Sequence, residues 1–223
     1  MKILYTNILP LATHDGQETI INCFIEQMKK ADRVEIAVGY TSSASLDELY
    51  KLVESCNISS ICLVIGMYYI EGMPERSYHQ AMKINQNWRN EGIGEIRLVK
   101  AFKYHGKIFC FYKNGVPVSA IIGSANLGAI KLEASNRRQY ETAVFTEDSA
   151  ETAEIATHID DLKQSNISAN IADMLDVPLL RETNTALNGI ELVTPIPQQN
   201  VIFYKQRPTK VSFLSSTEGA KKK

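Results

Sequence analysis

The stretch Tyr104-His105-Gly106-Lys107-Ile108-Phe109 places a histidine and a lysine two residues apart, and Gly123-Ser124-Ala125-Asn126 begins sixteen residues after that lysine. Alternate side chains of an extended strand point to the same face, so the sequence predicts that His105 and Lys107 project together from one side of a sheet. An imidazole beside an ammonium, with a glycine turn, a hydroxyl and an amide nearby, suits attack on a phosphodiester without a metal ion.

The composition is that of a globular protein with one sizeable core, because 44% of the 223 residues are hydrophobic and 22% are charged. The longest apolar runs, such as residues 61–65, are far shorter than the roughly 20 residues of a membrane span, and the first residues lack a signal-peptide core. We therefore expect a cytoplasmic protein that has no membrane partner.

The cysteines and the remaining histidines show no metal-site pattern. Four cysteines lack the short paired spacings of a zinc site, and we interpret them as reduced core residues: Cys23, Cys56, Cys62 and Cys110. Three histidines are interpreted as surface residues: His14, His79 and His158. No metal ion or other cofactor is expected.

Charge is unevenly distributed along the chain, although the net charge is only −1. Residues 97–138 contain eight basic residues and one acid, a balance of +7, whereas residues 147–182 contain nine acids and two basic residues, a balance of −7. The pattern reflects either chance and solvated faces or a site for a polyanion. Because the basic block surrounds His105 and Lys107, a phosphate backbone is the favoured occupant.

Strand and helix patterns alternate over the first hundred residues. Strands are predicted at residues 34–38, 61–65 and 95–99, and helices at residues 17–30, 45–56 and 75–90. Two of these helices are expected to begin at capping boxes, Asp15-Gly16-Gln17-Glu18 and Ser45-Leu46-Asp47-Glu48. The order predicts an α/β fold in which a mixed, largely parallel sheet carries helices on both faces.

The pattern changes after residue 100, where three β-rich segments are separated by turns. Strands are expected at residues 107–112, 118–122 and 142–145, with Asn114-Gly115 joining the first two as an antiparallel hairpin. A helix over residues 148–163 would complete a catalytic domain of residues 1–165. Residues 166–223 are less periodic and are interpreted as a C-terminal extension or linker toward an absent DNA-recognition domain.

The arrangement of His105-x-Lys107, Gly123-Ser124-x-Asn126 and the later Glu141 resembles the signature of the phospholipase D superfamily. Within that superfamily, the segments around His105 and Glu141 resemble the catalytic domain of NgoFVII-type, BfiI-like restriction endonucleases, and the resemblance covers about the first 165 residues. One position departs from the pattern, because Tyr112 stands where the superfamily usually has an aspartate.

This resemblance implies metal-independent hydrolysis of DNA through a covalent phosphohistidine. His105 would attack phosphorus, and the partner's His105 would protonate the leaving oxygen. Since the chain carries one copy of the motif, a homodimer would share a single active site at its interface. Glu141 would hold an imidazole nitrogen. The remaining expected site residues are Lys107, Ser124 and Asn126 around the phosphate oxygens and Gly123, Lys103, Arg137 and Arg138 as further substrate contacts, with the two arginines alternatively binding the partner's Glu141.

Other functions and plainer structural roles remain open at this point. The chain could be a phospholipase D-type hydrolase of RNA or phospholipid, although no membrane-docking segment is visible, or a nucleic-acid-binding scaffold whose site has decayed. Each site residue also has a plainer structural interpretation. His105 could be an ordinary strand histidine and Lys107 a solvated charge. Asn126 could be a helix cap or turn residue, and Glu141 an acid at the start of a strand. No base-reading module is visible, so we expect weak DNA cleavage without sequence preference.

Overall fold

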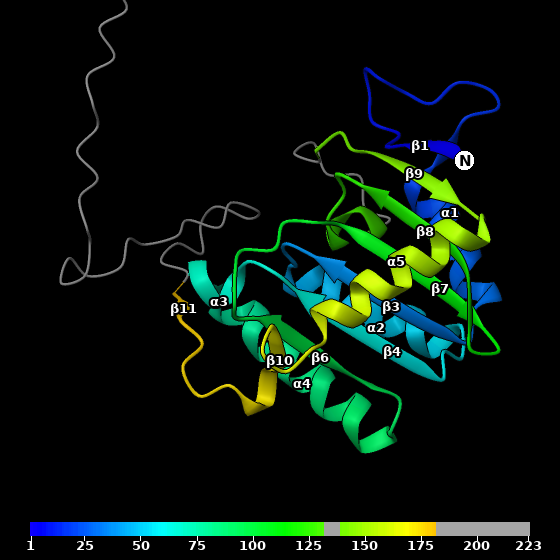
Figure 1. The fold of residues 1–223 in the computed structure, drawn as a ribbon. Helices are drawn as coiled ribbons and strands as arrows, with labels where there is room; N and C mark the ends of the chain where they lie inside the picture. The colour runs from blue at the N-terminus through cyan, green and yellow to red at the C-terminus, as the bar shows by residue number, and fades with distance from the viewer. Residues whose placement is uncertain (132–138, 182–223) are drawn as a thin grey trace, which may run out of the picture. The chain divides into compact units, whose positions relative to one another are not determined.

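A nine-stranded sheet organises the described part of the chain (Figure 1). The computed structural model describes residues 1–131 and 139–181, and these residues belong to one compact unit. The strands lie in the order β10-β6-β4-β3-β7-β8-β9-β1-β2. Their bounds are β1 (Lys2–Tyr5), β2 (Glu18–Thr19), β3 (Arg33–Val38), β4 (Ser60–Ile65), β6 (Gly94–Val99), β7 (Ile108–Lys113), β8 (Val116–Gly123), β9 (Thr142–Thr146) and β10 (Ser168–Asn170). A separate pair joins β5 (Met73–Pro74) to β11 (Leu179–Leu180).

The sheet is mixed, as predicted, but its parallel part is smaller than expected. Strands β3, β4 and β6 are parallel neighbours, and β1 pairs in parallel with β2. The other neighbouring pairs of this sheet are antiparallel: β3 with β7, β7 with β8, β8 with β9, β9 with β1 and β6 with β10. The β-α-β connections enforce parallel pairing among β3, β4 and β6. A short turn joins β7 to β8 and enforces their antiparallel pairing.

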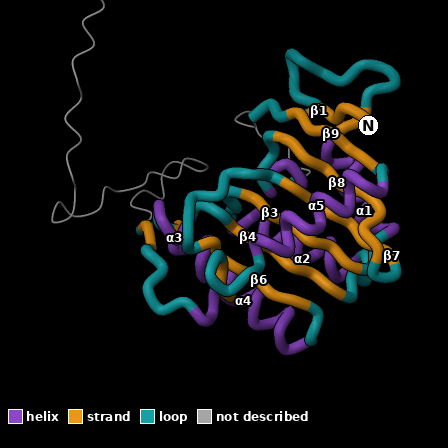
Figure 2. The backbone as a smooth tube through the Cα atoms, viewed as in Figure 1, coloured by secondary structure: helices purple, strands orange, loops and turns teal. Residues whose placement is uncertain are grey.

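Helices cover both faces of the sheet, as the sequence predicts (Figures 1 and 2). The helices are α1 (Ile20–Lys30), α2 (Ser43–Ser55), α3 (Tyr68–Glu71), α4 (Glu75–Glu91) and α5 (Ser149–Leu162), with 3-10 turns η1 (Leu127–Ile130) and η2 (Ile171–Asp173). Helices α1, α2 and α4 pack on one face and α5 packs on the other, and each layer has its own apolar cluster.

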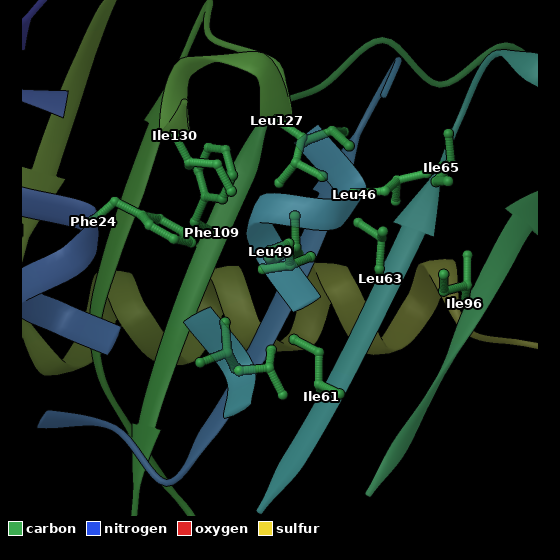
Figure 3. Close-up of a cluster of buried hydrophobic side chains, with 14 of the residues drawn as sticks. Phe24, Leu46, Leu49, Ile61, Leu63, Ile65, Ile96, Phe109, Leu127 and Ile130 are labelled. Atoms are coloured by element: carbon green, nitrogen blue, oxygen red, sulfur yellow. The ribbon is translucent and has the colours of Figure 1, made fainter. Parts of the chain in front are cut away.

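The larger cluster lies between α1, α2 and the central strands (Figure 3). Phe24 of α1 meets Phe109 of β7 edge-to-face with ring centroids 5.4 Å apart, and Leu49 of α2 packs above Leu63 of β4. Alternation along β4 sends Leu63 to this cluster and Val64 to the α5 side, so both faces of the strand are buried. A continuous apolar run is therefore what this central strand requires.

Helix α1 begins three residues later than the predicted start at residue 17. Glu18 and Thr19 form β2, which pairs with β1 and draws this segment into the extended conformation. Thr19 then caps the helix, since its hydroxyl accepts a hydrogen bond from the backbone of Asn22 at 3.2 Å. The predicted Asp15 capping box is therefore wrong.

Helix α2 begins earlier than predicted, at Ser43. Ser42 and Ser45 form the actual capping box: the Ser42 hydroxyl accepts from the Ser45 backbone at 3.2 Å, and the Ser45 hydroxyl accepts from the Ser42 backbone at 2.9 Å. Ser45 is thus the third residue of the helix rather than its cap.

The hairpin and three of the four cysteines agree with the sequence predictions. Asn114 and Gly115 both have positive φ angles, 51° and 80°, as a two-residue hairpin turn requires, and they join antiparallel β7 and β8. All four cysteines are free, with Cys56 partly exposed and the other three buried. Within residues 1–131 and 139–181, no helix is both long and apolar enough to cross a membrane.

Candidate active site

His105 and Lys107 lie in the loop that leads from β6 into β7, not on a strand as predicted. Strand β7 starts only at Ile108, and the two side chains differ in environment: His105 is exposed, whereas Lys107 is buried. The alternation expected of a strand therefore does not apply to this pair.

A glycine stands between His105 and Lys107 because the loop at Gly106 lies directly over the ring of Tyr104. The Tyr104 ring is buried beneath it, and a Cβ atom at position 106 would lie 2.3 Å from the Tyr104 hydroxyl oxygen. The Tyr104 backbone N–H also donates to the Gly66 carbonyl at 3.1 Å, which fixes the loop against the end of β4. Only glycine fits at position 106 in this conformation.

The Lys107 side chain is buried and packs under the loop that carries His105. Its Nζ donates to the backbone carbonyl of His105 at 2.6 Å, so the lysine braces the turn that presents the imidazole. Burial lowers the pKa of Lys107, and the negative charge of Glu141 opposes that shift. Lys107 therefore supplies a weakly solvated positive charge close to Glu141.

Gly123 and Ser124 tie the end of β8 to its neighbours. The Gly123 N–H donates to the Lys107 carbonyl at 3.2 Å, and a Cβ atom at Gly123 would lie 2.4 Å from the carbonyl oxygen of Thr142. The Ser124 hydroxyl donates to the Glu141 carboxylate and accepts from the Thr142 N–H at 3.2 Å. Ser124 thus holds Glu141 in place.

Glu141 makes no hydrogen bond to His105 within the chain, and its position is set by the neighbouring strand. Its backbone N–H donates to the Thr6 hydroxyl at 3.0 Å, and its carbonyl accepts from the Thr6 N–H at 3.1 Å. Among the described residues, the His105 imidazole has no hydrogen-bond partner, so the ring nitrogens remain available.

Asn126 and His105 meet at the end of β3. A Cβ atom built on Gly39 would lie 2.9 Å from His105 Cδ2 and 3.5 Å from Asn126 Oδ1, so both side chains flank the same point. The Asn126 Oδ1 accepts the backbone N–H of Tyr40 at 3.0 Å. An exposed imidazole beside an oriented amide, with a buried lysine two residues along the chain, is a set of groups suited to nucleophilic attack on an anionic ester.

Residues 18–176 match the family described as the NgoFVII restriction endonuclease N-terminal PLD domain. The chain belongs to this family. The resemblance inferred from the His105 and Gly123 motifs is thereby confirmed. No curated protein matches the sequence.

Two solved structures are similar to this NgoFVII-type PLD domain. Phosphatidylserine synthase from Haemophilus influenzae Rd KW20 is 11% identical with a TM-score of 0.50, and the match covers 78% of this chain and 41% of the synthase chain. Nuc from Salmonella typhimurium, a phospholipase D family member, is 14% identical with a TM-score of 0.48, and the match covers 76% of this chain and 95% of that chain. The first similarity supports the fold alone.

Tyr112, the departure from the superfamily pattern, has a structural role in this PLD domain. Its hydroxyl donates at 2.8 Å to the carboxylate of Glu35, which is buried on the neighbouring strand β3. Arg33 and Lys163 each donate to the same carboxylate at 2.6 Å. The carboxylate beside Tyr112 therefore comes from Glu35 of β3. Tyr112 belongs to the apolar cluster on the α5 side of the sheet.

Part of the basic block is paired with acids. Three of its members form ion pairs with acids outside the block: Arg97 with Glu95 at 2.6 Å, Lys103 with Glu71 at 2.8 Å and Lys113 with Asp32 at 3.7 Å. Arg137 and Arg138 lie outside the described residues. Among the described residues, Lys107 is the basic residue whose ammonium hydrogen-bonds to the His105 backbone.

Sequence reasoning missed two residues beside His105, Tyr40 and Glu71. The Tyr40 ring lies edge-on to the imidazole, and Glu71 accepts hydrogen bonds from the Tyr40 hydroxyl and from Lys103. Gly39 at the end of β3 was the only available signal, since a glycine after a buried strand often marks a close approach. Within the described residues, no group of three or more His, Cys, Asp or Glu side chains is placed to hold a metal ion.

Proposed function

We propose that this domain hydrolyses DNA phosphodiesters without a metal ion, through a covalent phosphohistidine on His105, as the catalytic part of a restriction endonuclease. The observation that carries this proposal is the exposed His105 imidazole beside Asn126, in a chain of the NgoFVII restriction endonuclease PLD family. We include residues 166–176 in the proposed catalytic domain, because β10 adds to the sheet and the family match runs to residue 176.

The reaction has two steps. In the first, a ring nitrogen of neutral His105 forms a bond to phosphorus while the bond from phosphorus to the leaving oxygen breaks, and the partner's His105 gives that oxygen a proton. In the second, the partner's His105 takes a proton from water as the water oxygen attacks phosphorus. The nitrogen–phosphorus bond then breaks, and its electron pair returns to His105.

Lys107 and Asn126 stabilise the charge that builds up on the phosphate oxygens. The Asn126 oxygen is occupied by the Tyr40 N–H, which leaves its Nδ2 as the donor toward substrate. The Lys107 charge is buried and therefore weakly screened, which increases its effect on a nearby anion. Ser124 acts through Glu141, because its hydroxyl proton is already donated to that carboxylate.

A shared site is supported by the absence of a hydrogen-bond partner for the His105 imidazole within residues 1–131 and 139–181. Glu141 binds Ser124 rather than His105, so the imidazole is available to a carboxylate and a second imidazole from another copy. One motif per chain supplies one histidine, whereas the two-step reaction uses two. We therefore propose a homodimer with the site on its two-fold axis.

The deciding experiment measures nicking of supercoiled DNA in excess EDTA, with His105→Ala in parallel. The wild-type domain should retain its activity in chelator, and the variant should lose at least about a thousandfold, the scale of losing an essential nucleophile. Loss of wild-type activity on adding EDTA would refute the metal-free mechanism. Activity that survives in His105→Ala would place the reaction elsewhere.

A further inference from the structure

The only ring contact of the His105 side chain among the described residues is with Tyr40. The two rings meet edge-to-face, with centroids 5.8 Å apart and an interplanar angle of 76°. Because the imidazole has no hydrogen-bond partner in that part of the chain, this aromatic contact and the close approach to Gly39 restrain its orientation. Aromatic rings favour such edge-to-face arrangements over a face-to-face stack.

Tyr40 is itself fixed from two other sides. Its ring packs edge-on against Tyr68, with centroids 5.5 Å apart, and its hydroxyl donates to the Glu71 carboxylate. The other Glu71 oxygen accepts from Lys103 at 2.8 Å. Burial, followed by the hydrogen bond to Glu71, raises the pKa of Tyr40 to about 12, so the hydroxyl stays a donor at neutral pH.

The backbone at the same corner fixes a second site residue. The Tyr40 N–H donates to Asn126 Oδ1 at 3.0 Å, and Gly39 leaves room for the His105 ring to lie directly against the main chain. The turn after β3 therefore contacts both the proposed nucleophile and the proposed oxygen-binding amide.

We propose that the Gly39-Tyr40 corner, held mainly by the packing of the Tyr40 ring, is the positioning element of this active site. The Tyr40 ring sets the orientation of the His105 imidazole, and the Tyr40 N–H sets that of the Asn126 amide. Tyr40 acts through these residues and does not touch the reacting atoms. This inference rests on the proposed function, because it assigns the corner a role in the reaction of His105.

The corner also gives Lys103 a different role from the predicted one. Its ammonium pairs with Glu71 in the free protein, and Glu71 in turn holds Tyr40. Since Lys103 and Glu71 are both exposed, their ion pair holds the ring only weakly, and most of the restraint comes from the packing of Tyr40 itself.

The first test compares Tyr40→Leu with Tyr40→Phe, measuring kcat and KM for DNA nicking together with the thermal unfolding midpoint. Leucine removes the ring, and a misplaced nucleophile should lower kcat about a hundredfold with KM within about twofold. Phenylalanine keeps the ring but loses the bond to Glu71, and kcat should fall no more than about fivefold. A rise in KM at unchanged kcat in Tyr40→Leu would show direct DNA contact and overturn the inference.

Gly39→Ala provides a second test that leaves Tyr40 intact. The added methyl would lie 2.9 Å from His105 Cδ2, so the imidazole has to move, and kcat should fall at least about tenfold in a folded protein. Gly128→Ala is the matched control, because a Cβ atom there meets nothing within 4 Å. Wild-type kcat in Gly39→Ala would overturn the inference even if Tyr40→Leu failed to fold.

His105→Ala, measured in the same series, separates this inference from the proposed function. An active His105→Ala protein refutes the proposed function. An inactive His105→Ala protein with near-wild-type kcat in both Tyr40→Leu and Gly39→Ala refutes only the positioning role.

Discussion

At the scale of single residues, the burial of Lys107 gives the reaction a defined pH dependence. Burial lowers the pKa of Lys107 from the ordinary value of 10.5. The charged form is therefore lost at a lower pH than for a solvated lysine, and cleavage should decline on the alkaline side below pH 10.5. Nicking rates measured across that range test this, and full activity persisting up to pH 10.5 would contradict it.

The same shift predicts how stability changes with pH. The unfolded chain binds its lysine proton more tightly than the folded chain, so the free energy of unfolding should rise with pH between the lowered pKa and 10.5. Lys107→Met should remove this increment and abolish cleavage, because methionine fills the space without a charge to bury. Urea unfolding at two pH values in that window measures the increment, and an equal increment in Lys107→Met would contradict the assignment.

Tyr112 should matter for stability and not for catalysis. Tyr112→Phe removes one hydrogen bond to the buried Glu35 carboxylate, which should lower the free energy of unfolding by about 1.5–3 kcal/mol. Urea unfolding measures this loss. The kcat of the Tyr112→Phe variant should equal that of the wild type, since no described contact joins Tyr112 to His105 or Asn126. A large fall in kcat without loss of stability would instead tie Tyr112 to the site.

At the scale of elements, Arg97 fastens the edge strand β10 to the sheet. Its guanidinium donates to the Ser168 hydroxyl at 2.9 Å, to the Ser168 carbonyl at 2.8 Å and to the Lys163 carbonyl at the end of α5 at 2.8 Å. Arg97→Met should lower the free energy of unfolding by roughly 3 kcal/mol, because several buried polar groups lose their partner.

Hydrogen exchange and urea unfolding test this fastening. The amides of β10 should lose protection before those of β4 in the Arg97→Met protein. Lys51→Met is the control, because Lys51 is exposed and lies 3.9 Å from Glu48, and its effect should stay within about 0.5 kcal/mol. Equal stability of the two variants would show that β10 does not depend on Arg97.

The elements that periodicity identifies best are those whose environment is set by burial alone. Strands β3, β4 and β6 and helix α4 lie within a residue or two of their predicted positions. Helix starts were less predictable, because the start of α1 depends on the pairing of β2 with β1. Strand direction was also less predictable, because an apolar run looks the same in either direction.

The site was predictable only as far as local motifs extend. His105, Lys107, Ser124, Asn126 and Glu141 stand in recognisable spacings, whereas Tyr40 and Glu71 reach the site through contacts between residues 31 apart in the sequence. The prediction that His105 lies on a strand was wrong, because β7 and its alternating side chains begin only at Ile108. The packing of Tyr104 under Gly106 keeps this segment a loop, and that contact has no periodic signature.

At the scale of the whole molecule, the proposed reaction requires two copies of the chain, each contributing one histidine to a single site. Mixing differently tagged wild-type and His105→Ala chains, with subunit exchange verified by co-purification, tests this directly. At a roughly threefold excess of the variant, about a quarter of wild-type chains find a wild-type partner, so DNA nicking should fall to about a quarter of its unmixed value. Nicking that stays unchanged although mixed dimers have formed would show that each chain cleaves with its own histidine, and would contradict the shared site.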